Sequence, residues 1–160
     1  MQAQTPAVPM LERWTLDEDI LELNLEPIAF LVALTERWGV ERIDATELEY
    51  RCFLQLARDF PDRPLAPSRD VDAFWHCHVL TLGLYLEHCQ KLFGRPLLHW
   101  PFSGALGEAD AARQRARFEE SRCLISELLH RVRSTHSLKP IQGVAHDHDE
   151  RSIPHRLSEP

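Results

Sequence analysis

The sequence predicts an all-α protein: a compact single-domain bundle of five or six helices with a disordered C-terminal tail. Apolar residues recur at helical spacing in several segments, and no segment shows the alternation of a β-strand. The 160 residues, of which 44% are hydrophobic and 27% charged, suffice for one core in a soluble globular protein. We expect a mobile arm over residues 1–15, a helical domain over 16–133 and the tail over 134–160.

The first helices are predicted from prolines and capping residues. Residues 16–25 fit either a short helix or an extended docking segment. Pro27 is well placed as the first residue of a helix with an apolar face, and Gly39 offers that helix a left-handed stop. The pattern Asp44-Ala-Thr-Glu47 matches a capping box, so a second helix is expected from there until Pro61 ends it.

Ser68 is the expected cap of the next helix, because it follows a stiff loop with three prolines. Residues 70–93 form either one unbroken helix or two helices. A break is plausible where Thr81 can cap a new helix and Gly83 tolerates a bend. A long amphipathic helix from Glu108 to about Arg133, acidic at its start and basic at its end, is expected to close the bundle.

Composition excludes several classes of partner. The formal net charge of −7 argues against nucleic acid and against anionic membrane surfaces, since both require concentrated Lys and Arg. The longest apolar run, residues 28–34, is far short of the roughly 20 residues that span a membrane. Four cysteines without a Cys-x-x-Cys pair, and no secretory leader, favour a reduced, cytoplasmic setting. A protein partner remains open.

Groups that bind metals or move protons concentrate between residues 68 and 102, among aromatic and aliphatic residues. The predicted metal ligands are His76, His78, Cys89 and His99. Imidazoles with one thiolate suit zinc, and they are also acceptable to iron or copper. The side chains expected to support these ligands from behind are Asp72, Trp75 and Tyr85.

The proposed ligands converge only if the helix breaks. In an unbroken helix His78, Tyr85 and Cys89 share one face, while His76 points nearly the opposite way. With a break near Thr81, both imidazoles lie in the last turn of the first helix and can meet Cys89 and His99.

The other candidates have simpler interpretations. A histidine on an apolar stripe beside tryptophan and tyrosine is often a hydrogen-bonded core residue rather than a ligand. His88 is expected at the surface, and Cys52 and Cys123 are expected in the core. Cys77 is at best a reserve ligand, because its helical phase points away from Cys89.

One pattern in this stretch resembles the signature of the glycine-rich domain-containing protein-like family. It reads Pro67-Ser68-x-x-Val71-Asp72-x-x-Trp75-His76-x-His78-x-Leu80, followed by Tyr85, Cys89, Gly94-Arg95 and His99-x-Pro101. The resemblance spans residues 47–102. It implies a helical module without an established biochemical activity, found in plants and bacteria, of which this chain resembles a bacterial stand-alone version.

Plant members of that family are larger multidomain chains linked to development and stress responses. They tend to carry Asn-Pro where this chain has Thr81-Leu82, which favours the helix break. They also extend into glycine-rich regions, whereas this chain has six glycines. A family signature concentrated on ligand-type residues favours a common role for His76, His78, Cys89 and His99.

Three functions follow from these observations. The first is a small helical protein with a zinc site, which is structural if four protein ligands close it. The second is a metal-dependent enzyme with an open coordination position, in which Tyr85 or Asp72 manages protons. The third is a metal-free interaction module, in which the histidines belong to the core and an apolar groove binds a partner protein. The sequence leaves open whether the protein is an enzyme.

Overall fold

The computed structural model of this protein describes residues 15–98 and 107–136. These residues form six helices and no strand, which confirms the predicted all-α class. The helices are α1 (Glu18–Leu21), α2 (Glu26–Glu36), α3 (Val40–Asp59), α4 (Arg69–Leu80), α5 (Leu82–Phe93) and α6 (Glu108–His136). In the part of the chain described, no helix is both long enough and apolar enough to cross a membrane. The predicted arm, apart from residue 15, and the tail beyond residue 136 lie outside the described residues.

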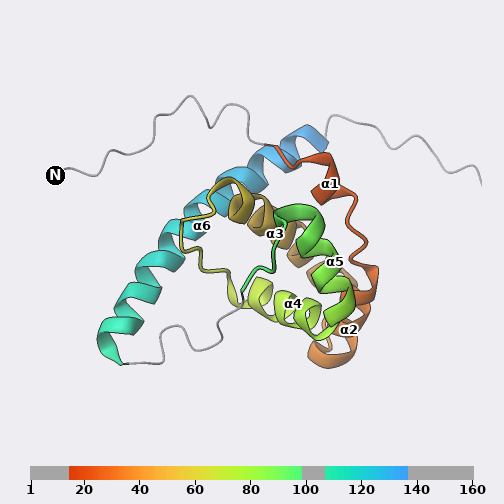
Figure 1. The fold of residues 1–160 in the computed structure, drawn as a ribbon, viewed down its shortest axis with the longest axis horizontal. Coiled ribbons are helices and arrows are strands. Elements are labelled where there is room, and N and C mark those ends of the chain that lie inside the picture. Colours follow the sequence, from red (N-terminus) through yellow and green to blue (C-terminus); the bar gives the residue numbers. More distant parts are fainter. Residues whose placement is uncertain (1–14, 99–106, 137–160) are drawn as a thin grey trace, which may run out of the picture.

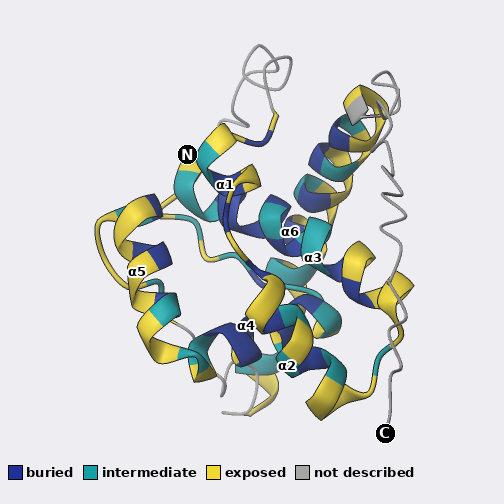
Figure 2. Cartoon of the chain, turned by 90° about the vertical axis from the view of Figure 1, so that its right-hand side faces the viewer, coloured by how far each residue is buried: buried dark blue, intermediate teal, exposed yellow. Residues whose placement is uncertain are grey.

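Helix α3 occupies the centre of the bundle. It packs against α1, α2, α4 and α6, and α4 packs in turn against α2 and α5. Figure 1 shows α6 along one edge of the molecule and α4 and α5 on the other side of α3. The helices turn their buried residues toward this centre (Figure 2). Among the fully buried side chains are Tyr50 of α3, Phe74 of α4 and Leu128 of α6, so three helices contribute to one core.

Polar side chains of α3 hold the segment that precedes α2. Arg51 donates hydrogen bonds to three backbone carbonyls at the end of α1 and just beyond it. Arg58 forms ion pairs with Asp17 and Asp19, the latter with a nitrogen–oxygen distance of 2.7 Å. Residues 16–25 therefore combine the two predicted alternatives, since a short helix is followed by a docked stretch without regular structure.

Two boundaries predicted near residue 40 are wrong. The left-handed residue that ends α2 is Arg37, with φ of 56°, whereas Gly39 has φ of −74° and is the N-cap of α3. Helix α3 begins at Val40, so the predicted cap Asp44 lies inside it. The reason is tertiary packing. Ile43 is only 6% exposed, and its burial favours a helix that starts one turn before the local capping pattern.

Of the two alternatives for residues 70–93, the structure has two helices with a break between them, but the side chain of Thr81 forms no cap hydrogen bond with α5, contrary to expectation. Thr81 separates the two helices and has φ of −86° and ψ of 58°, outside the helical range. Its hydroxyl donates to the carbonyl of His78 at 2.7 Å, which satisfies an acceptor in the last turn of α4. As a result α4 and α5 meet at an angle, as Figure 1 shows.

The remaining helix ends lie close to the positions predicted from the sequence. Ser68 is the N-cap of α4, and its hydroxyl accepts a hydrogen bond from the backbone N–H of Val71 at 3.3 Å. Gly94 follows α5 with φ of 66°, a conformation that glycine adopts without steric cost. Helix α6 starts at Glu108 as predicted and continues to His136, three residues past the expected end.

Replacing Ser68 with alanine is expected to lower the free energy of unfolding by about 1 kcal/mol, because the N–H of Val71 loses its acceptor at the start of α4. Urea unfolding followed by circular dichroism measures the change. Ser126→Ala is the matched control, since Ser126 lies exposed inside α6 and alanine favours a helix interior. Equal effects of the two substitutions would contradict a capping role for Ser68.

Candidate functional site

A hydrogen-bonded row of three side chains crosses the core between α3, α4 and α5. His78 is 1% exposed, and its two ring nitrogens have different partners. Nδ1 lies 2.8 Å from the hydroxyl oxygen of Tyr50, and Nε2 lies 3.0 Å from Nδ1 of His88. A neutral imidazole has one N–H and one lone pair, so His78 donates to one of these partners and accepts from the other. The row is satisfied without any further group.

Burial keeps this row uncharged. It lowers the pKa of His78 from 6.5 to about 3, and the neighbouring His88 lowers it further in the same direction. Burial also lowers the pKa of His88, and it raises the pKa of the Tyr50 hydroxyl well above its ordinary value. The three side chains are therefore neutral near pH 7, as hydrogen-bonded core residues are.

The structure places the four predicted metal ligands in different surroundings. His78 and Cys89 are buried, whereas His76 lies on the exposed side of α4. His99 lies outside the described residues. Within residues 15–98 and 107–136, no group of three or more His, Cys, Asp or Glu side chains is arranged to hold a metal ion. The metal site stays a prediction.

Two of the side chains expected to support those ligands connect other parts of the molecule. The indole N–H of Trp75 donates to the hydroxyl oxygen of Tyr85 at 3.1 Å, and that hydroxyl donates to the backbone carbonyl of Leu97. Tyr85 thus ties α4 and α5 to the segment that follows α5. Asp72, the third of them, is exposed on α4.

His88 is the residue of the site that sequence reasoning missed. It was expected at the surface and is instead 7% exposed, in contact with His78. Because the helix is interrupted at Thr81, residues of α5 do not continue the 100° spacing of α4. Counting residues 70–93 as one continuous helix therefore assigns His88 to the wrong face. The spacing of Tyr85, Cys89 and Leu92, counted within α5 alone, places His88 on the same face and could have corrected the count.

The predictions for the other cysteines are confirmed only in part. Cys52 is buried in the core as expected, but Cys123 is exposed on α6, so its prediction is wrong. Cys77 is buried with its sulfur 3.6 Å from the hydroxyl of Thr35 on α2. Burial raises the pKa of the thiols of both Cys52 and Cys77, which makes them poor nucleophiles.

A recess of about 340 Å³ opens beside this core, where α3 ends and the segment after α5 passes it. We call it the aromatic recess. Its floor is formed by the buried side chains of Phe53, Trp75 and Leu92. Partly buried walls are contributed by Phe60, Leu65, Phe93 and Leu97. Three prolines, Pro61, Pro64 and Pro96, also line it and restrict the backbone of its rim.

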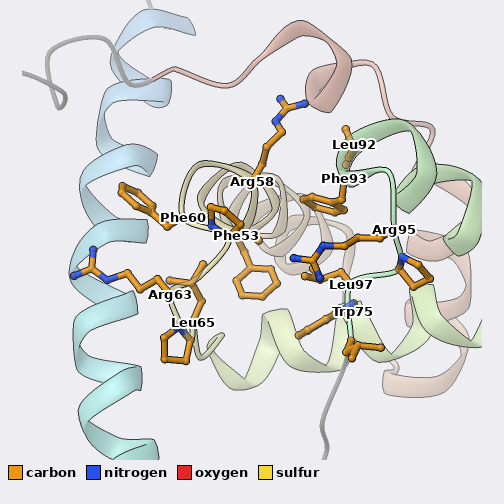
Figure 3. A pocket seen from close by; sticks show the side chains of 15 residues that line it. Phe53, Arg58, Phe60, Arg63, Leu65, Trp75, Leu92, Phe93, Arg95 and Leu97 are labelled. Carbon is orange, nitrogen blue, oxygen red and sulfur yellow. The ribbon is translucent and has the colours of Figure 1, made fainter.

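Three arginines border the aromatic recess, and they are oriented differently. Figure 3 shows Arg58 extending toward α1 and Arg63 toward α6, whereas Arg95 reaches into the space beside Phe93 and Leu97. The first two are held by carboxylates: Arg58 by Asp17 and Asp19, and Arg63 by Glu120. Arg95 forms no ion pair or hydrogen bond with any described residue.

Acidification is expected to destabilise the fold before carboxylates titrate. Between pH 6.5 and about 3 the unfolded chain binds a proton at residue 78 that the folded chain excludes, so the free energy of unfolding decreases as the pH falls. The slope from this one histidine is about 1.4 kcal/mol per pH unit. Urea unfolding at a series of pH values above 4.5 measures it. His130→Gln, at an exposed position of α6, should leave the slope unchanged. A free energy of unfolding that does not change with pH in this range would contradict a neutral, buried His78.

Comparisons of this chain with protein-family models, with curated proteins and with solved structures found no match. The resemblance to the glycine-rich domain-containing protein-like family therefore stays a prediction from the motif.

Proposed function

We propose that this chain is a protein-interaction module whose aromatic recess receives an apolar anchor side chain of a partner protein. The observation that carries the proposal is a preformed recess with a buried aromatic floor that opens to the surface. Exposed apolar hollows of this kind are the usual sites of ligand and partner binding. The proposal takes up the third function considered from the sequence.

The size of the recess favours a single anchor. Its volume of about 340 Å³ is near the lower end of the roughly 300–1,000 Å³ of pockets that enclose small molecules. A few large side chains inserted into such hollows supply most of the binding energy of many protein interfaces. One aromatic or aliphatic side chain, flanked by peptide backbone along the open side, suits these dimensions.

The walls of the recess are fixed before a partner arrives. The rings of Phe53 and Trp75 pack with their centroids 5.1 Å apart, and the indole of Trp75 is hydrogen-bonded to Tyr85. Tyr85 also holds the carbonyl of Leu97, which belongs to the opposite wall. Since these side chains are already ordered, binding loses less conformational entropy than it would on a mobile surface.

In this proposal the buried histidines belong to the scaffold. Every buried side-chain nitrogen and oxygen in the described ranges has a hydrogen-bond partner, so the core around His78 contains no polar atom that requires a ligand. The row from Tyr50 to His88 joins α3, α4 and α5. These are the three helices that carry the floor of the recess.

Filling the recess should weaken the binding of a partner peptide. Random peptides displayed on phage are selected on the full chain, and the affinity of a selected synthetic peptide is measured by calorimetry. Ala57→Phe places a ring into the recess from α3 and is expected to weaken binding at least about tenfold, because the anchor loses its space. Leu86→Ala removes an exposed leucine of α5 outside the recess and should leave the affinity unchanged. Failure to select a peptide, or equal binding by the folded Ala57→Phe variant, would contradict the proposal.

The predicted zinc site is a second candidate, favoured by one observation. His78 Nε2 and His88 Nδ1 face each other at 3.0 Å. Two imidazole nitrogens bound to tetrahedral zinc, with bonds of about 2.0–2.1 Å, lie about 3.3 Å apart. In this version His88 takes the place of His76, while Cys89 and His99 remain the other predicted ligands. The enzyme alternative adds an open coordination position, so it depends on the same metal.

Metal analysis separates the two candidates. A zinc site predicts one zinc per chain in protein purified without an affinity tag, a lower melting temperature after chelation, and loss of the metal in His88→Gln. His130→Gln is the control, since it removes an exposed histidine of α6. Elemental analysis that finds no metal above background, with melting unchanged by chelator, would exclude the zinc site and leave the interaction module.

A further inference from the structure

We infer that the partner segment carries a carboxylate beside its apolar anchor and that Arg95 binds this carboxylate. The occupant of the aromatic recess is then an acidic peptide segment of a partner protein. The inference rests on the proposed function, because it specifies the partner of the same site. It also gives a role to Arg95, the one arginine at the recess that forms no ion pair with a described residue.

Only one of the three arginines remains available for a partner. Arg58 and Arg63 are held in ion pairs with neighbouring helices, and their guanidinium groups point out of the recess (Figure 3). Arg95 reaches into it beside apolar side chains and has no polar partner among the described residues. An arginine that faces an apolar hollow without a counter-ion is complementary to an apolar ligand with one negative charge.

The neighbouring residues fix the backbone position of Arg95 at the edge of the recess. Gly94 turns the chain back after α5 with φ of 66°. Pro96 follows, and a proline restricts the residue before it to extended conformations. One residue further on, the carbonyl of Leu97 is held by the hydroxyl of Tyr85. With its backbone anchored on both sides, Arg95 is presented at the edge of the recess rather than on a free loop.

A carboxylate is the anion that this arrangement suits. The planar guanidinium forms two parallel hydrogen bonds with a carboxylate, which fixes the direction of the bound segment as well as its charge. Arg95 is exposed in the free protein, and an apolar anchor seated against Phe93 and Phe53 would cover one side of the ion pair and strengthen it relative to a fully exposed one.

A double-mutant cycle tests the pairing. A peptide selected on the full chain is synthesised with its Asp or Glu and with the matching Asn or Gln, and each form is titrated against wild type and Arg95→Gln. Each single change is expected to weaken binding about tenfold, and the two together should cost little more than one alone. Arg113→Gln is the matched control, because Arg113 is an exposed arginine of α6 outside the recess. Arg95→Glu should prefer the peptide in which Lys replaces the acidic residue.

The outcomes distinguish this inference from the proposed function. Peptides that lose affinity with Ala57→Phe but show no preference for an acidic residue, or no loss with Arg95→Gln, overturn the inference and leave the interaction module standing. Unchanged binding by Ala57→Phe overturns both. If the chain sediments as a dimer and Ala57→Phe makes it monomeric, the occupant of the aromatic recess is a second copy of the chain, and the inference of an acidic partner peptide is overturned. Peptide binding that occurs only after Trp100 and Phe102 are replaced by alanine would make the chain's own segment the occupant.

Discussion

The interruption of the helix at Thr81 decides how the second half of the domain is built. The hydroxyl of Thr81 binds the carbonyl of His78, and the chain changes direction there instead of continuing α4. Because α5 turns back, His88 meets His78 and Tyr85 meets Trp75. The same turn carries the segment after α5 past the end of α3, where it forms one wall of the recess. The buried polar row and the candidate binding site therefore both depend on the direction that the chain takes at Thr81.

The buried row makes the packing of α5 specific at some cost in stability. Burying three polar side chains is unfavourable unless each is hydrogen-bonded, and here each member depends on its neighbour. An apolar core of equal volume could be as stable, but it would accept several rotations of α5 about its axis. The hydrogen bonds of the row form in only one rotation of α5 about its axis. Since Tyr85 extends this constraint to Leu97, the geometry of the recess is connected to that of the core.

Local chemistry could be predicted from the sequence, and relations between distant segments could not. Ser68 was found because a capping side chain acts within a few residues of itself, and Thr81 was recognised as a possible break although its hydroxyl binds back to α4 instead of capping α5. The start of α3 was missed because the burial of Ile43, a tertiary contact, outweighed the capping pattern at Asp44. His88 was assigned to the surface because its helical phase was counted across the break at Thr81 and not within α5 alone.

The candidate site was only partly predictable for the same reason. Trp75 and Tyr85 were recognised as important, but as supports of a metal site whose ligand His99 the structure does not describe. The aromatic recess was not located, because its lining combines residues 53–65 with residues 92–98. Nothing in the sequence shows that these segments meet. A groove for a partner was considered only as a function class, without a position.

The distribution of cysteines gives the protein a built-in set of reporters of local opening. Each of α3, α4, α5 and α6 carries one cysteine: Cys52, Cys77, Cys89 and Cys123. Only the thiol of Cys123 is exposed, so a maleimide reagent added to the native chain modifies α6 first and labels it alone. The other three thiols become reactive when their own helix moves away from the core. Alkylation rates of Cys52, Cys77 and Cys89, each kept as the single cysteine, would thus rank α3, α4 and α5 by the free energy of their opening, without the introduction of a new thiol.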